Sequence, residues 1–177
     1  MKIVAFGASY SKSSINKQLA QHTANHFENQ EIEILDLNDY NLPVFTVDIE
    51  KEQGHPEVLL QFIQKLDSAD LIIISMAEHN GSYTAAFKNL FDWTSRVKLN
   101  MFENKKLLLL STSPGGRGAE SSLNTAAERF PRHGATILDR FSLPNFHQNF
   151  DVEKGILQEE KKIELQEIIN RIKSELV

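Results

Sequence analysis

The sequence contains no cysteine, and this absence excludes several kinds of chemistry. None of its 177 residues can form a disulfide, bind zinc or an iron–sulfur cluster through a thiolate, or act as a thiol nucleophile. A chain without disulfides suits a reducing compartment. Glycine (8), proline (5) and tryptophan (1) are also scarce, and we find neither a repeat nor a low-complexity tract.

The sequence also lacks an excess of positive charge and any long apolar run. Its 19 Lys and Arg against 24 Asp and Glu give a net charge of −5, so we expect no nucleic-acid partner. No apolar run approaches the roughly 18 residues of a membrane span. The first apolar stretch, Ile3–Phe6, is too short for a signal peptide. We therefore expect a cytoplasmic protein without a membrane partner, with residues 1–177 forming one domain.

Five short apolar or alternating segments are each followed by a helical pattern. The expected strands are Ile3–Phe6, Glu31–Leu37, Leu71–Ile74, Leu107–Leu110 and Ala135–Phe141. The expected helices are Ser13–Phe27, Pro56–Leu66, Tyr83–Val97, Ser121–Phe130 and Ile156–Leu176, with residues 38–55 as a long connection. This alternation predicts an α/β fold with a five-stranded parallel sheet between helical layers. The strand order 2-1-3-4-5 and a Rossmann half both fit, and either places a binding crevice at the carboxyl ends of the strands.

The loop after the first expected strand is rich in serine and opens a helix. Four of the six residues from Ser9 to Ser14 are serine. Hydroxyls beside the free N–H groups of a helix start are suited to binding a phosphate. The alternative is that Ser13 or Ser14 only caps the helix and the others are solvated. The loop lacks the glycine patterns of nucleotide hydrolases and of dinucleotide folds.

The loop after the third expected strand contains Glu78-His79 and then Asn80-Gly81. The second pair is a strong turn signal, since both residues tolerate positive φ and would aim N–H groups into the crevice. Glu78 and His79 resemble an acid/base pair, but we favour a turn or subunit contact for Glu78 and a wall position for His79. The only tryptophan, Trp93, is expected to pack in the core.

The loop after the fourth expected strand, Ser113–Gly118, holds three glycines within four residues. Glycine lets a main chain approach a ligand closely, although such a loop can equally be a mobile surface segment. None of these loops offers a nucleophile–base–acid set. The six histidines show no metal-ligand spacing, since His22 and His26 are four apart on an expected helix but no H-E-x-x-H motif accompanies them. Abundant main-chain donors without a protein catalyst suggest that a cofactor performs the chemistry.

Three segments together resemble the NADPH-dependent FMN reductase family. They are the serine loop Ala8–Asn16, the stretch Glu78–Trp93 with its Lys88-Asn89 and Asp92-Trp93 pairs, and Ser113–Gly118. The resemblance covers about residues 1–150 and implies a flavodoxin-like three-layer sandwich with strand order 2-1-3-4-5. It also implies an enzyme that passes hydride from NADPH or NADH to FMN and then to a small oxidant such as a quinone, azo compound, chromate or free flavin.

The same resemblance assigns cofactor contacts. The implied phosphate ligands are Ser9, Ser11, Ser14, Ile15 and Asn16. The implied contacts of the flavin ring are Ala77, Glu78, His79, Asn80 and Gly81, and those of its pyrimidine edge are Ser113, Pro114, Gly115 and Gly116. No catalytic side chain and no metal are implied. The resemblance further implies a homodimer or homotetramer, with the helix Tyr83–Val97 as a contact.

Two positions depart from the family pattern. Arginine is common in the family where Ser11 stands, and Pro-Glu-Tyr-Asn is usual where this chain has residues 77–80. These departures affect the expected substrate preference more than flavin binding. Phe45 and Phe146 are candidates for the walls of the pocket or for a subunit interface. The alternative function is a flavodoxin-like electron carrier that binds FMN but does not use nicotinamide.

Overall fold

The computed structural model describes residues 1–176 and contains a five-stranded parallel sheet in the order β2-β1-β3-β6-β7. The strands are β1 (Lys2–Gly7), β2 (Glu31–Ile34), β3 (Leu71–Met76), β6 (Lys105–Thr112) and β7 (Ala135–Leu143). Numbered among themselves, these strands have the order 2-1-3-4-5. The flavodoxin-type alternative is therefore confirmed.

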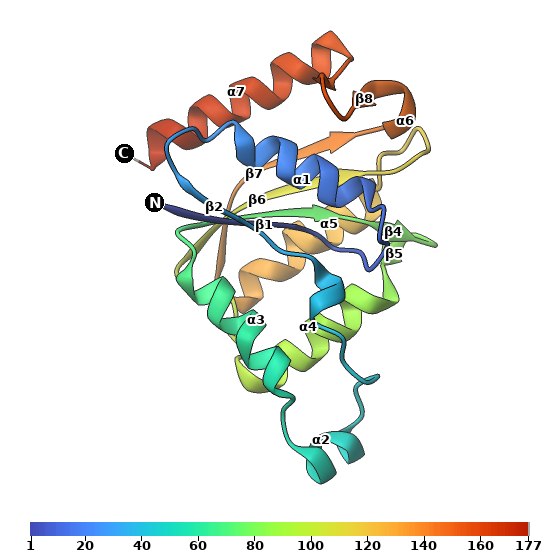
Figure 1. The fold of residues 1–177 in the computed structure, drawn as a ribbon, viewed down its shortest axis with the longest axis vertical. Coiled ribbons are helices and arrows are strands. Elements are labelled where there is room, and N and C mark those ends of the chain that lie inside the picture. Colours follow the sequence, from blue (N-terminus) through green and yellow to red (C-terminus); the bar gives the residue numbers. More distant parts are fainter. Residues whose placement is uncertain (177) are drawn as a thin grey trace.

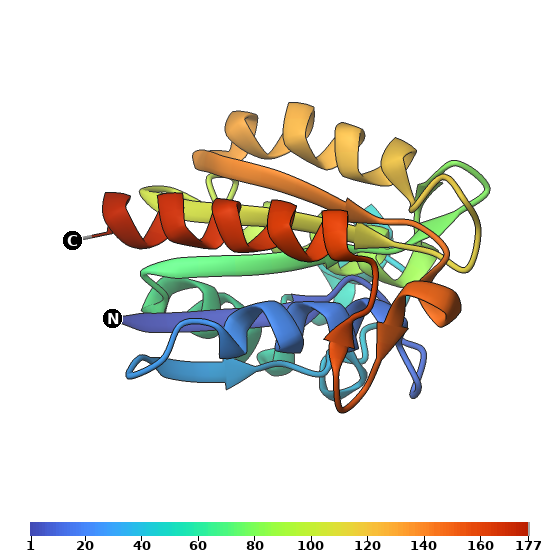
Figure 2. The same ribbon diagram turned by 90° about the horizontal axis from the view of Figure 1, so that it is seen from above.

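Helices cover both faces of this sheet (Figures 1 and 2). One face is covered by α1 (Ile15–Asn25) and α7 (Glu159–Glu175). The opposite face is covered by α3 (Glu57–Ser68), α4 (Ala85–Val97) and α5 (Glu120–Arg129). The result is the expected three-layer sandwich.

The sheet has an apolar core on each side because its central strands are buried on both faces. In β3, Ile72 and Ile74 face the α3–α4–α5 layer, whereas Leu71 and Ile73 face the α1–α7 layer. All four are fully buried. Burial of one such side chain stabilises the folded state by about 1.5–3 kcal/mol. Because both faces of a central strand are buried, its sequence is a continuous apolar run and does not alternate apolar with polar residues.

The long connection over residues 38–55 is more structured than expected. A 3-10 turn at Leu37–Asp39 leads into it, because β2 ends at Ile34, before the expected Leu37. The connection also contains the helix α2 (Val47–Gln53), which lies farthest from the sheet in Figure 1. The hydroxyl of Thr46 caps α2 by accepting from Ile49 N–H. None of its residues is buried, so the helix has no apolar stripe that periodicity could detect.

The last expected helix begins later than predicted. Ile156 lies in the short strand β9 (Gly155–Ile156), which pairs with β8 (Phe150–Asp151) after the helix α6 (Phe146–Asn149). Ile163, within the range of the expected helix, is 51% exposed. The expected helix therefore starts three residues too early, and its first residue belongs to the β8–β9 hairpin. Among residues 1–176, we find no helix with the length and apolar character needed to cross a bilayer.

Candidate functional site

A cleft of about 340 Å³ lies at the carboxyl edge of the sheet, where the loops after β1, β3 and β6 converge. Ten predicted site residues line it: Ser9, Ser11, Ser14, Ile15, Asn16, Ala77, Glu78, His79, Ser113 and Pro114. Three further lining residues were not predicted: Ser13, Thr112 and His147. The structure thus brings together three loops that are far apart along the chain, near residues 9–16, 77–79 and 112–114.

Four predicted residues lie outside the lining of this cleft. Asn80 and Gly81 form the turn of a hairpin between β4 (Glu78–His79) and β5 (Ser82–Tyr83), with φ of 53° and 78°. This confirms the turn. Gly115 and Gly116 lie exposed on the loop after β6. The glycine that requires positive φ there is Gly118, at 56°.

The serine loop is built around the start of α1. Ser14 caps the helix, since its Oγ accepts a hydrogen bond from Lys17 N–H at 3.1 Å. The first main-chain N–H groups of the helix, at Ile15 and Asn16, have no partner within the helix. Such groups favour an anion, and the surrounding hydroxyls add donors. The capping role of Ser14 and anion binding are compatible, since its hydroxyl proton is not used by the cap.

The lysine in the first turn of α1 is already paired. Lys17 Nζ lies 2.6 Å from Asp36 Oδ2, and this ammonium group holds the pKa of that carboxyl down at about 2. Lys17 therefore supplies no free charge to an anion, whereas Lys12 within the serine loop is exposed and the other donors of the loop are neutral N–H and O–H groups.

Asn16 links the start of α1 to the strand ends that form the floor of the cleft. Its side-chain Nδ2 donates to Thr112 O, and its Oδ1 accepts from Thr112 N–H and from Ser75 Oγ. Because these bonds occupy the amide, the group that Asn16 presents to the cleft is its main-chain N–H. The bonds join α1 to the ends of β3 and β6, which fixes the floor of the cleft.

Gly7 allows β1 to approach α1 closely. A Cβ atom at Gly7 would lie 2.4 Å from Lys17 N and 2.7 Å from the carbonyl carbon of Asn16. Main-chain atoms cannot yield at such distances without moving the helix. The absence of a side chain at Gly7 therefore sets the position of the helix start beside the cleft.

The turn after β3 is fixed to the start of α5. Ser122 N–H donates to Glu78 Oε2 at 3.0 Å, and Ser122 Oγ donates to Ala77 O at 2.9 Å. The α5 dipole favours a carboxylate in this place. Glu78 therefore serves the turn, as favoured from the sequence. His79 is an exposed wall residue of the cleft.

The glycine loop is tied to the segment that follows β7. Asn145 N–H donates to Gly115 O, and Phe146 N–H donates to Ser113 O, both at 3.0 Å. These bonds place α6 beside the loop and bring His147 to the cleft. The mobile alternative for this loop is not supported by these main-chain bonds.

Trp93 and the two phenylalanines considered for the pocket walls lie elsewhere. Trp93 is fully buried and donates from Nε1 to Pro43 O at 2.8 Å, so it packs as expected. Phe45 packs edge-on against Trp93, and Phe146 is buried against Phe150. Neither phenylalanine lines the cleft.

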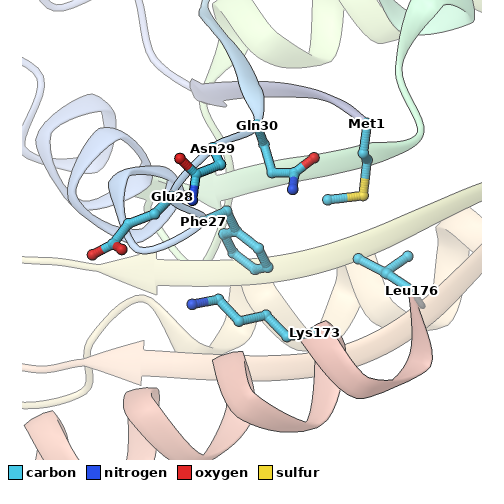
Figure 3. Close-up of a pocket in the computed structure, with 7 residues that line it drawn as sticks. All are labelled: Met1, Phe27, Glu28, Asn29, Gln30, Lys173 and Leu176. Carbon is cyan, nitrogen blue, oxygen red and sulfur yellow. The ribbon is translucent and has the colours of Figure 1, made fainter.

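A second hollow, of about 410 Å³, lies at the opposite edge of the sheet (Figure 3). It is formed by Met1, residues 27–30 and the end of α7 at Lys173 and Leu176. Ligands of open α/β sheets bind outside the carboxyl ends of the strands. The cleft at the serine loop is therefore the candidate site, although it is the smaller of the two.

The residues of the cleft fit a phosphate-bearing cofactor. They supply hydroxyls, a free helix start and main-chain N–H groups over a firmly bonded floor. Within residues 1–176, we find no group of three His, Asp or Glu side chains able to hold a metal ion.

Known proteins share this architecture. An Arabidopsis thaliana protein named NADPH:quinone oxidoreductase is 28% identical, over 96% of this chain and 88% of its own. The solved structure of FerB, an NAD(P)H:(acceptor) oxidoreductase from Paracoccus denitrificans, matches with a TM-score of 0.75 at 22% identity, over 96% and 93% of the two chains. An FMN-dependent NADH-azoreductase from Bacillus anthracis, solved with FMN, matches with a TM-score of 0.63 at 17% identity, over 97% and 99%.

The fold and the position of the cleft define a flavodoxin-like α/β protein. The family model described as NADPH-dependent FMN reductase matches residues 1–148, and the chain belongs to this family. It is accordingly an oxidoreductase that uses FMN and NAD(P)H. The family assignment favours the enzyme over the electron-carrier alternative.

Proposed function

We propose that this protein transfers reducing equivalents from NAD(P)H to a small-molecule oxidant, with FMN held in the cleft at the serine loop. The observation that carries the proposal is the convergence of three sheet loops on one cleft that the start of α1 enters. The name of the Arabidopsis relative supports a quinone as the oxidant. The proposed setting is the cytoplasm, and the proposed assembly is a homodimer or homotetramer with α4 as a contact.

Each loop has a proposed role toward the cofactor. Ser9, Ser11 and Ser14, with the main-chain N–H groups of Ile15 and Asn16, would hold the phosphate. The turn from Ala77 to Gly81 would lie along the flavin ring, and Ser113–Gly116 along its pyrimidine edge. Because Ser14 is only 5% exposed and already oriented by its cap bond, its hydroxyl would bind phosphate with little loss of side-chain freedom.

The protein itself would supply placement and charge stabilisation. When bound, FMN supplies the capacity to accept and deliver a hydride. The main-chain N–H groups of the turn after β3 would stabilise negative charge on the ring. The Glu78–Ser122 contact would hold this turn in place, and no side chain needs to act as a general acid.

The proposal is tested with the purified full-length protein. Titration with FMN should give saturable 1:1 binding, followed by flavin fluorescence, and riboflavin should bind more weakly because it lacks the phosphate. Under anaerobic conditions, NADPH or NADH should bleach the bound flavin, and a quinone should restore its colour. Failure to bind FMN, or bound flavin that neither nicotinamide bleaches, would overturn the proposal.

A comparison of oxidants identifies the substrate class. Turnover should be measured with a quinone, an azo dye, chromate and free flavin at matched concentrations. We expect the highest kcat/KM with the quinone. A clear preference for the azo dye, chromate or free flavin would leave the proposed oxidoreductase activity in place and identify that oxidant as the substrate.

A further inference from the structure

We propose that His22 on α1 and His26, the residue that caps the C-terminus of α1, form a binding site for one late divalent transition-metal ion, with Cu²⁺ bound most tightly. The pair lies in the half of α1 that is farther from the serine loop, so the site is separate from the cofactor cleft. This inference does not depend on the proposed function.

The distance between the two rings fits one shared metal ion. The residues are four apart on a helix, and their Nε2 atoms lie 3.4 Å from each other. Two metal–nitrogen bonds of about 2.0–2.1 Å that meet at a tetrahedral angle separate their nitrogens by about 3.3–3.4 Å. The observed spacing fits a tetrahedral ion as it stands, and the square-planar geometry of Cu²⁺ requires the two nitrogens to approach each other by about 0.5 Å. With each ring proton on Nδ1, both Nε2 lone pairs are available to the ion.

The hairpin of β8 and β9 holds the His22 ring in this position. Phe150 packs edge-on against it with ring centroids 5.4 Å apart. At Gly155, where φ is 76°, a Cβ atom would lie 2.2 Å from Cε1 of His22. The main chain of the hairpin thus lies against the ring of His22. This contact holds the His22 side chain in one rotamer before a metal binds.

The pair is uncharged at neutral pH, which suits a metal ligand. Burial, together with the neighbouring His26, lowers the pKa of His22 to about 4. Burial also lowers the pKa of His26, on which Lys173 and Glu28 have opposing effects. Protons therefore do not compete with a metal ion for these nitrogens at pH 7.

Space for the remaining ligands lies beside His22. A small hollow of about 130 Å³ is lined by Gln18, Gln21, His22, Asn25, Phe150 and Val152. His26 does not line this hollow, so water molecules held there would complete the coordination of the ion from the side of His22. Two imidazoles with water favour Cu²⁺ over Ni²⁺ and Zn²⁺, and exclude tight binding of Mg²⁺, which requires oxygen ligands.

The test uses the full, FMN-loaded chain without a histidine tag, which would itself bind these ions. Isothermal titration with Cu²⁺ should give one site per chain, and the electron paramagnetic resonance spectrum should show coupling to two imidazole nitrogens. Affinity should fall in the order Cu²⁺, then Ni²⁺ and Zn²⁺, with no saturable binding of Mg²⁺. The thermal unfolding midpoint should rise with Cu²⁺.

The decisive variant is His26→Gln, because His26 is only partly buried and its loss leaves the contact of His22 with Phe150 in place. It should weaken Cu²⁺ binding at least about tenfold, whereas the matched control His55→Gln should bind as the unaltered protein does. His22→Gln should show the same loss if it folds. Unchanged Cu²⁺ affinity in His26→Gln, or no saturable binding by the unaltered protein up to about 1 mM, would overturn the proposal.

Discussion

The side chain of Asn16 and the main chain of Thr112 form a two-bond clasp across 96 residues of sequence. Asn16 Nδ2 donates to Thr112 O, and Thr112 N–H donates to Asn16 Oδ1, both at 3.1 Å. Asn16 is 3% exposed and Thr112 is 1% exposed. The bonds are therefore shielded from water, and each group depends on its partner.

Removal of this clasp should destabilise the whole fold. Asn16→Ala leaves the main-chain groups of Thr112 and the hydroxyl of Ser75 without their buried partner, at a cost of roughly 2–4 kcal/mol. Urea unfolding followed by circular dichroism measures this cost. Asn25→Ala, at an exposed position of the same helix, should change stability by less than about 0.5 kcal/mol. Equal effects of the two variants would show that the clasp is not important for stability.

Ser14→Asp should separate helix capping from phosphate binding. Aspartate caps a helix as well as serine does, so the free energy of unfolding should change by less than about 0.5 kcal/mol. A carboxylate beside the FMN phosphate should weaken FMN binding at least about tenfold through like-charge repulsion. Riboflavin, which has no phosphate, is the control and should bind nearly as before. Unchanged FMN affinity would place the phosphate elsewhere.

Glu78 and Ser122 should be energetically coupled. Glu78→Ala removes the acceptor of Ser122 N–H and should cost about 1–2 kcal/mol, whereas Ser122→Ala removes the bond to Ala77 O. Both bonds hold the junction between the turn after β3 and the start of α5. The loss of stability in the double variant should therefore be smaller than the sum of the two single losses by at least about 0.5 kcal/mol. Chemical denaturation of all three variants measures this coupling. Glu120→Ala, exposed in the first turn of α5, is the matched control, and strict additivity would contradict the coupling.

Stability should fall as the pH is lowered from about 6.5 to about 4, in part because of His22. The unfolded chain takes up this proton at the ordinary pKa of 6.5, whereas the folded chain resists it until about pH 4. Acid therefore favours the unfolded state across this window, by roughly 1–2 kcal/mol after allowance for solvent screening. Urea midpoints at several pH values should show this slope, and His22→Gln should reduce it. An equal reduction in His55→Gln would assign the slope to histidines in general.

The sheet was predictable from sequence because its strands are buried on both faces. The apolar runs at 71–74 and 107–110 mark β3 and β6, and the structure extends β3 to Met76 and extends β6 at both ends, to Lys105 and Thr112. The Asn80-Gly81 pair predicted its turn for the same local reason, since both residues adopt positive φ. Such features depend on short segments and need no knowledge of distant contacts.

Features that depend on distant contacts were not predictable. The α2 helix has no buried residue, so no periodicity reveals it. His147 reaches the cleft because main-chain bonds tie α6 to the glycine loop, and no sequence spacing records those bonds. The use of the Asn16 amide as a clasp likewise depends on residues that fold beside it from the ends of β3 and β6.

The close approach at Gly7 also restricts how this protein can diverge. Any side chain at that position displaces the start of α1, so a single substitution would disturb the floor and the anion-binding groups together. Ser11, only a few residues later, is exposed and its side chain meets no such obstacle. We therefore expect substitutions in related sequences to accumulate at the rim of the cleft, whereas Gly7 and the start of α1 that it contacts should stay unchanged.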